Sequence, residues 1–229
     1  MPDIFYPKTE QDVSDFIFDN YNKSNPIEIV GHGSKKIGRL IQSSQTLSLS
    51  SMSGILEYFP EELYIKVLPG TPLSEIETTL KQKNQFFGFE PNDLGYLYDG
   101  KSNSGSIGGV VSCNLSGPGR FKNGALRDHV LGFKSVNGSG GKVKSGGTVV
   151  KNVTGYDLSK LITGSFGTLI ALTELTFKVL PMKNSSGTLI IHEYNKDEIA
   201  KLFNNLLGSS NEISGSVFVP VEPSNKTYT

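Results

Sequence analysis

The sequence contains a single cysteine, Cys113, among its 229 residues. One cysteine excludes an intrachain disulfide framework and leaves no cysteine cluster for a metal or an iron–sulfur centre. Its neighbours are Val110, Val111, Ser112 and Asn114, a run more typical of a packed core residue than of a nucleophile. We therefore expect Cys113 to be buried.

The sequence also lacks long apolar runs and an excess of charge of either sign. No apolar run approaches the roughly 20 residues that cross a bilayer, and the first residues lack the basic-then-apolar pattern of a signal peptide. Lys+Arg and Asp+Glu both number 22, so no global field favours nucleic acid or an anionic membrane. We expect a cytoplasmic protein with no transmembrane segment and no nucleic-acid partner.

Catalytic and metal-binding patterns are missing as well. The three histidines, His32, His129 and His192, are scattered, and none belongs to a nucleophile–histidine–acid set. No group of His, Asp and Glu has metal-ligand spacing. The residues therefore identify no catalytic group and no metal site.

Glycine, by contrast, is abundant. The chain has 26 glycines, and they are densest between positions 105 and 168. Glycines this dense, with apolar residues between them, indicate a backbone that must approach another group closely. A second short run, at residues 31–35 (Gly-His-Gly-Ser-Lys), directly follows an expected strand. Such a turn can gather N–H groups around a phosphate, although an ordinary turn is the alternative. His32 is either an exposed loop residue or a residue that could hold a bound group covalently.

Strands and helices are mixed without a regular βαβ repeat, which predicts an α+β fold. Thr9 is expected to cap the first helix, and Thr71 to cap another with Pro72 at its first position. That second helix should bury Leu73, Ile76 and Leu80. The expected strands are at 27–30, 47–49, 55–58, 63–67, 130–136, 142–144, 168–180, 188–192 and 213–219, with further helices at 157–162 and 195–207.

A polar break at residues 181–187 is the best domain boundary. It divides the chain into a domain at 1–181 and a C-terminal segment at 182–229. The segment is too small to close a core alone.

One exact motif match is rejected. Residues 95–102 (Gly-Tyr-Leu-Tyr-Asp-Gly-Lys-Ser) satisfy the Walker A pattern. A phosphate loop should lead into a helix, whereas Asn103-Ser104-Gly105 follows here, and Asp99 would place a carboxylate beside the phosphates. An NTPase is therefore a minor alternative.

Longer motifs carry a family resemblance. They lie at residues 31–35, 69–73 (Pro-Gly-Thr-Pro-Leu), 108–118 (Gly-Gly-Val-Val-Ser-Cys-Asn-Leu-Ser-Gly-Pro), 127–132 (Arg-Asp-His-Val-Leu-Gly) and 151–161 (Lys-Asn-Val-Thr-Gly-Tyr-Asp-Leu-Ser-Lys-Leu). In this order they resemble the PCMH-type FAD-binding domain of the vanillyl-alcohol oxidase flavoproteins, above all the FAD-binding E subunits of bacterial glycolate oxidases.

The resemblance implies two α+β subdomains that grip FAD, followed by the start of a truncated substrate (cap) domain at 182–229. The family's covalent histidine does not align with His32, so FAD is expected to bind non-covalently. Ile170 stands where the family has glycine and could crowd the cofactor. The residues that the resemblance assigns to cofactor binding are Gly31, His32, Gly33, Ser34, Lys35, Pro69, Gly70, Thr71, Gly108, Gly109, Asn114, Ser116, Gly117, Arg127, Asp128, Gly155, Tyr156, Asp157, Gly164, Gly167 and Thr168.

The function implied by the resemblance is that of an FAD-binding subunit in a glycolate oxidase-like complex. Such a complex oxidises glycolate or another short 2-hydroxy acid to the 2-oxo acid. Its expected partners are a paralogous FAD-containing catalytic subunit and an iron–sulfur subunit, through which the protein could be held at the inner membrane. The alternative is a non-catalytic assembly or electron-relay subunit that supports a catalytic paralogue.

Overall fold

The computed structural model describes residues 3–35, 41–92, 94–98, 105–148, 156–192 and 195–220. Helices and strands are mixed along the chain, which confirms the α+β expectation. The chain divides into two compact units, Met1–Met182 and Lys183–Thr229. The division falls one residue from the expected boundary.

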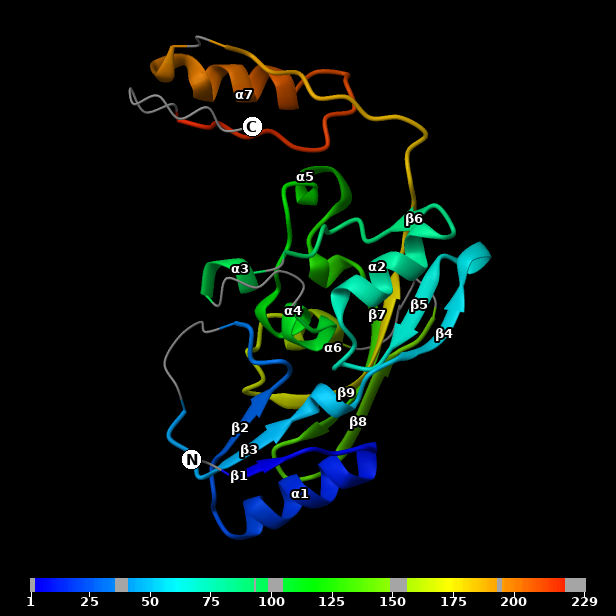
Figure 1. The fold of residues 1–229 in the computed structure, drawn as a ribbon, viewed down its shortest axis with the longest axis vertical. Coiled ribbons are helices and arrows are strands. Elements are labelled where there is room, and N and C mark those ends of the chain that lie inside the picture. The colour runs from blue at the N-terminus through cyan, green and yellow to red at the C-terminus, as the bar shows by residue number, and fades with distance from the viewer. Residues whose placement is uncertain are drawn as a thin grey trace. The chain divides into compact units, whose positions relative to one another are not determined.

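A small parallel sheet forms one part of the first unit (Figure 1). Its strands are β1 (Asp3–Phe5), β2 (Ile27–Val30) and β3 (Gln45–Ser48), with β3 in the centre. Helix α1 (Glu10–Asn22) connects β1 to β2. Thr9 caps α1 as expected: its Oγ1 accepts from the Asp12 N–H at 3.1 Å, and the Asp12 carboxylate accepts from the Thr9 N–H at 2.9 Å.

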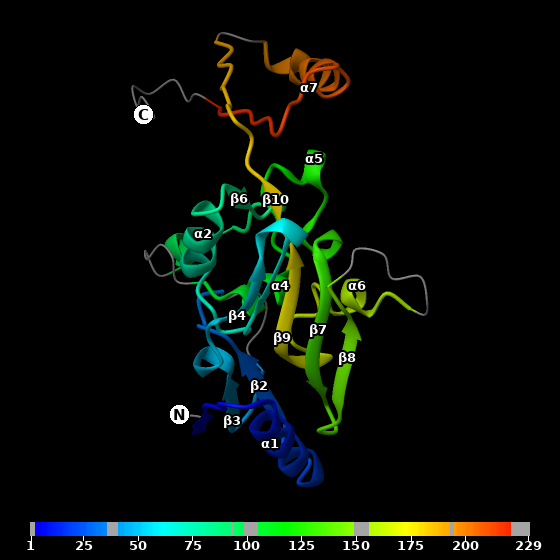
Figure 2. The same cartoon turned by 90° about the vertical axis from the view of Figure 1, so that its right-hand side faces the viewer.

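A five-stranded antiparallel sheet forms the larger part, in the order β4-β5-β9-β7-β8 (Figure 2). The strands are β4 (Ile55–Phe59), β5 (Tyr64–Val67), β7 (Val130–Asn137), β8 (Lys142–Gly146) and β9 (Ile170–Lys178). The strands expected at 130–136 and 142–144 are both present and pair as an antiparallel hairpin. Asn137 closes it, because its side-chain oxygen accepts from the N–H groups of Ser139 and Gly141.

Short helices and the two strands β6 and β10, which pair as a small sheet, complete this unit. They are η1 (Leu49–Ser51), η2 (Pro60–Glu62), α2 (Leu73–Lys81), β6 (Gln85–Phe86), α3 (Gly95–Tyr98), α4 (Ile107–Cys113), α5 (Arg120–Asn123), η3 (Leu126–Asp128), α6 (Leu158–Ile162) and β10 (Leu180–Pro181). Within the described residues, no helix is long and apolar enough to cross a membrane.

The expected cap of α2 is wrong, although its buried face is as predicted. Leu73, Ile76 and Leu80 are buried, but the N-cap is Pro72 and the helix begins at Leu73. The Thr71 hydroxyl is buried and donates to the Leu68 carbonyl at 2.6 Å, while it accepts from the Gly54 N–H at 3.0 Å. Its oxygen is therefore engaged between two turns and does not cap the helix.

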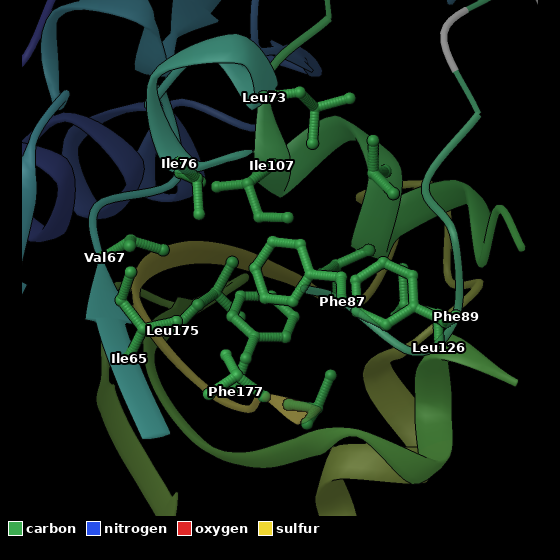
Figure 3. Packing of buried hydrophobic residues seen from close by; sticks show 14 of the residues in the cluster. Ile65, Val67, Leu73, Ile76, Phe87, Phe89, Ile107, Leu126, Leu175 and Phe177 are labelled. Carbon is green, nitrogen blue, oxygen red and sulfur yellow. The ribbon is translucent and has the colours of Figure 1, made fainter. Parts of the chain in front are cut away.

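The main core lies between the large sheet and the helices α2 and α4 (Figure 3). Phe87 and Phe89 stack with ring centroids 4.9 Å apart, and the ring of Phe177 on β9 lies 5.3 Å from that of Phe87. A second cluster joins Val13 and Ile17 of α1 to Val136 of β7. The two clusters correspond to the two expected subdomains.

The second unit contains η4 (Lys196–Glu198) and α7 (Ile199–Leu207), where one helix at 195–207 was expected. The strands predicted at 188–192 and 213–219 are wrong, because neither segment pairs with another strand among the described residues. A strand needs a hydrogen-bonded neighbour, and alternating apolar residues alone do not supply one.

The rejection of the Walker A match is supported for its first half. Residues 95–98 form the short helix α3 and do not form a loop that follows a buried strand. Residues 99–102 lie outside the described part of the chain.

His129 is buried beneath the core phenylalanines, at the start of β7. Its Nε2 lies 2.8 Å from the Asn123 carbonyl and its ring meets Phe89 edge-on, while its buried Nδ1 has no hydrogen-bond partner in the described part of the chain. Burial lowers the pKa of His129, and the positive charge of Lys178 adds to this. The Asn123 carbonyl and Asp128 oppose the change. We conclude that the imidazole is neutral, with its proton on Nε2.

This environment predicts that the stability of the first unit falls in mild acid. Because the folded pKa lies below the ordinary 6.5, the unfolded chain takes up the proton first as the pH falls below that value. The free energy of unfolding of the wild type should therefore decrease from pH 7.5 to pH 5. Urea unfolding of His129→Gln should show a smaller decrease, and parallel curves for the two proteins would contradict the prediction.

Candidate functional site

A cavity of about 420 Å³ opens between the end of β2, the helix α4 and the start of β9. This volume is within the range of small-molecule sites. The residues that line it are Glu28, Ile29, Val30, Gly31, His32, Gly33, Ser34, Lys35, Ile41, Leu49, Pro69, Ser106, Gly108, Gly109, Ser112, Cys113, Phe166, Gly167, Thr168, Ile170 and Leu172. The walls therefore come from segments that are far apart in the sequence.

The loop at residues 31–35 forms the polar end of the cavity. Gly33 has a φ of +68°, a left-handed conformation that glycine adopts without strain. The N–H groups of Gly33 and Ser34 donate to no acceptor among the described residues. His32 is exposed, Ser34 is buried and Lys35 is half-buried. Backbone donors beside a lysine suit an anionic group.

Close backbone approach fixes the position of α4 against this loop. A Cβ added at Gly31 would overlap the Ser106 Oγ, and one at Gly108 would lie 2.8 Å from the Pro69 carbonyl oxygen. A Cβ at Gly109 would lie 3.3 Å from the Lys35 Nζ. Glycine is therefore required by backbone packing at 108, and at 31 it avoids the Ser106 hydroxyl.

The turn at residues 69–71 holds the beginning of α4. The Gly108 N–H donates to the Pro69 carbonyl at 2.8 Å, and the Ile107 N–H donates to the Thr71 carbonyl at 3.0 Å. The Gly70 N–H donates to the Met52 carbonyl at 2.8 Å. Pro69 lines the cavity, whereas Gly70 and Thr71 support it from behind.

The inner face of α4 presents Gly109, Ser112 and Cys113, at the i, i+3, i+4 spacing of one helix face. Cys113 is half-buried and lines the cavity, so the expectation of a buried packing residue is only partly met. Burial raises the pKa of the Cys113 thiol above its ordinary 9.0, and the charge of Lys35 partly offsets this. The thiol is therefore protonated at neutral pH.

The segment 164–170 forms the opposite wall. Gly164, Phe166 and Gly167 have φ values of +87°, +53° and +72°. The Gly164 N–H donates to the Val111 carbonyl at 3.0 Å, and the Phe166 N–H donates to the Ser112 carbonyl at 2.8 Å. Ile170, whose side chain was expected to crowd the site, lines the cavity and also packs against the main core.

A second group of expected site residues lies beyond the far end of α4. Asn114 ends α4 with a φ of +52°, and its buried side-chain oxygen has no hydrogen-bond partner among the residues that the structure describes. The Ser116 Oγ accepts from the Leu126 N–H at 2.9 Å, and the Gly117 N–H donates to the Glu90 carbonyl at 2.8 Å. These contacts build the loop after α4 and do not reach the cavity.

The remaining expected residues have local roles in the structure. Arg127 and Asp128 are exposed, and the Asp128 carboxylate accepts from the Ala125 N–H at 3.0 Å. Tyr156 is exposed, and Asp157 caps α6 by accepting from the Lys160 N–H at 3.1 Å. Gly155 lies outside the described residues. The assignment of this group to the cofactor stays a prediction.

Sequence reasoning missed several residues of the cavity. Ser106 lines it but was not proposed, Ser112 and Phe166 lie inside the resembling segments 108–117 and 164–168 but were not singled out, and Cys113 was assigned to the core. The helical spacing of Gly109, Ser112 and Cys113 could have identified the α4 face, whereas no sequence pattern pointed to Phe166. Within the described residues, no group of three or more His, Cys, Asp or Glu could hold a metal ion.

The cavity, the glycine-containing loop at 31–35 and the flanking sheets suit a domain that binds a dinucleotide, and comparison with known proteins gives the class. Residues 3–147 match the family described as "FAD binding domain". Glycolate oxidase subunit GlcE of Escherichia coli K12 is 40% identical over 185 residues, which are 79% of this chain and 51% of that protein. D-lactate dehydrogenase of Anaerostipes hadrus is 34% identical over 152 residues, 66% of this chain and 30% of that protein.

A solved structure of alkyldihydroxyacetonephosphate synthase shares the fold. It superposes with a TM-score of 0.66 at 22% identity, over 80% of this chain and 32% of that chain. The chain thus spans about half, or less, of the length of these relatives. It belongs to the FAD binding domain family, and its fold is that of a PCMH-type domain.

The cavity fits the cofactor that this family name implies. Side chains at Gly31 and Gly108 would meet Ser106 and Pro69, so these glycines let the walls of the cavity come together, and the N–H groups of Gly33 and Ser34 face no described acceptor. Lys35 supplies a positive charge for a pyrophosphate. Residues 31–35 would hold the phosphates, while α4 and the segment 166–170 would line the attached groups.

The overlap at Gly31 predicts a steric cost that a second substitution relieves. Gly31→Ala should lower the free energy of unfolding by about 1–3 kcal/mol, because the new methyl group meets the Ser106 hydroxyl. Adding Ser106→Ala should recover most of this loss, since the methyl would then lie 3.5 Å from the residue 106 Cβ. A double-mutant cycle from urea unfolding measures the coupling. Additive effects would show that the close approach is not the cause.

The environment of Cys113 predicts slow alkylation. Because burial raises the pKa of the thiol, its rate of reaction with iodoacetamide should remain low at pH 7 and rise only above about pH 9. Lys35→Met should slow the reaction further, since the lysine lowers the pKa. Fast labelling at pH 7 in the native protein would contradict the assignment, and labelling in urea provides the unhindered reference rate.

Proposed function

We propose that the chain supplies the FAD-binding domain of a flavoenzyme that oxidises a short 2-hydroxy acid to the 2-oxo acid. The observation that carries the proposal is the cavity between the loop at 31–35 and α4, in a chain 40% identical to a glycolate oxidase subunit. Glycolate is the first substrate to test. D-lactate, which the name of the second relative includes, belongs to the same chemical class.

The residues of this chain would bind and position the cofactor, and the cofactor would carry out the redox chemistry. Residues 31–35 would bind the phosphates, Gly108 and Gly109 would allow close approach, and the apolar wall with Ile170 and Leu172 would exclude water. When bound, FAD supplies the acceptor for the two electrons and two protons that leave the C–H and O–H of the hydroxy acid. We name no catalytic residue.

Binding is proposed to be non-covalent, and two considerations support this. Cys113 lines the cavity, and its raised pKa keeps it as a thiol, which is less reactive than a thiolate. His32 is exposed at the edge of the loop. The proposed partners are a paralogous FAD-containing subunit and an iron–sulfur subunit that would receive the electrons. The word "subunit" in the name of the E. coli relative supports an assembly of more than one chain. The segment 182–229 is proposed as the beginning of a substrate (cap) domain.

Reconstitution of the purified chain with FAD tests the proposal. We expect stoichiometric binding, seen as quenching of flavin fluorescence, and release of all flavin on acid precipitation. Anaerobic glycolate, or D-lactate, should then bleach the flavin absorbance near 450 nm when the partner subunits are present. Flavin that stays with the precipitated protein would contradict non-covalent binding.

The outcomes separate the candidate functions. A chain that binds no FAD would overturn the assignment of the cavity. A chain that binds FAD but whose flavin is never bleached, in a complex whose partner flavin is bleached, would identify an assembly or electron-relay subunit.

A further inference from the structure

Phe166 has an unusual backbone conformation at the mouth of the cavity. Its φ is +53°, in the left-handed region where bulky side chains are rare, and it is followed by Gly167 at +72°. The side chain lines the cavity and is 52% exposed. An aromatic residue thus occupies a strained backbone position, and its ring is not buried deeply enough to offset the strain.

Neighbouring contacts hold the residue in this conformation. The Phe166 N–H donates to the carbonyl of Ser112 at the end of α4. A Cβ at Gly167 would lie 3.7 Å from the Cβ of Ile29, two residues before the loop that begins at Gly31. Phe166 therefore lies where α4 and β2 come together. Strain that the surrounding structure maintains is typical of ligand-binding positions.

The fold itself gives no reason for a phenyl ring here. Phe166 belongs to neither hydrophobic core cluster and makes no aromatic pair among the described residues. Asn or Gly would adopt the same φ with less strain. Because the ring lines the cavity and has no packing role among the described residues, a ligand bound there is the partner available to it.

We infer that Phe166 is a stacking residue, whose ring covers a planar heteroaromatic ring of the bound dinucleotide. The inference rests on the proposed FAD binding. A ring attached to phosphates at residues 31–35 would extend along β2 and the end of α4, where Phe166 lies. Both the adenine and the isoalloxazine ring of FAD have this chemistry. Base–aromatic stacking changes affinity by about tenfold or more.

Three substitutions at this position separate stacking from packing. Phe166→Asn removes the ring and tolerates the left-handed backbone, Phe166→Tyr keeps the ring, and Phe166→Leu keeps apolar bulk without a ring. Phe121→Asn is the matched control, because Phe121 on α5 is 68% exposed and does not line the cavity. The dissociation constants of FAD, ADP and FMN are measured by fluorescence or calorimetry, and the Tm of the ligand-free protein is measured alongside.

We expect Phe166→Asn and Phe166→Leu to weaken FAD binding about tenfold, while Phe166→Tyr and Phe121→Asn bind like the wild type. The ligand-free Phe166→Asn protein should keep the wild-type Tm or gain about 2–4 °C, because strain is relieved. A merely structural role for the ring would lower the Tm instead. A loss confined to ADP would place the ring on adenine, and a loss confined to FMN would place it on the flavin.

Unchanged FAD affinity in Phe166→Leu would overturn the inference. The same variant still provides the test if Phe166→Asn folds poorly. Failure of the wild type to bind FAD would overturn the proposed function instead, so the two failures are distinguishable.

Discussion

The absence of a Cβ at Gly31 and Gly108 is the constraint on which the site depends. At Gly108 the start of α4 and the turn at Pro69 lie closer together than a side chain would permit, and at Gly31 a side chain would meet the Ser106 hydroxyl. The hydrogen bond from Gly108 to the Pro69 carbonyl forms only at this separation. Because the parallel sheet carries the loop and the main core carries α4, this junction also fixes one subdomain against the other.

The electrostatics of the cavity follow from the same arrangement. Lys35 brings a positive charge to the lining and Glu28 a carboxylate, the loop at 31–35 brings backbone N–H groups, and Leu49, Ile170 and Leu172 add apolar surface. This mixture of polar and apolar surface suits a ligand that carries both phosphates and a flat ring. The neutral Cys113 thiol lies within reach of Lys35 and adds no charge.

Much of the fold was predictable because local rules agree with tertiary packing. The Thr9 cap, the Asn137 hairpin and the apolar face of α2 follow from side-chain chemistry within a few residues. Thr71 failed as a cap because its hydroxyl bonds to Gly54, a contact distant in sequence. The strands expected at 188–192 and 213–219 failed because a strand needs a partner that sequence patterns do not supply.

Part of the candidate site was predictable from its glycines. The part that depends on three-dimensional shape was not. Residues 31–35, Gly108 and Gly109 were identified from their glycines, and all of them line the cavity. Ser106 and Phe166 were missed, because their roles arise from a collision and from a backbone angle that exist only in three dimensions. Glycines at 117 and 164 serve packing beside the site, so glycine density alone does not separate ligand contact from close packing.

The walls of the cavity come from residues 28–35, 69, 106–113 and 166–172, which meet only after the chain has folded. A ligand that touches all of them binds the native state and has no comparable site on the unfolded chain. At a concentration one hundred times its dissociation constant, such a ligand adds about 2.7 kcal/mol to stability by mass action. The cellular half-life of this protein would then depend on the supply of its cofactor, and a shortage of riboflavin would appear first as a loss of protein.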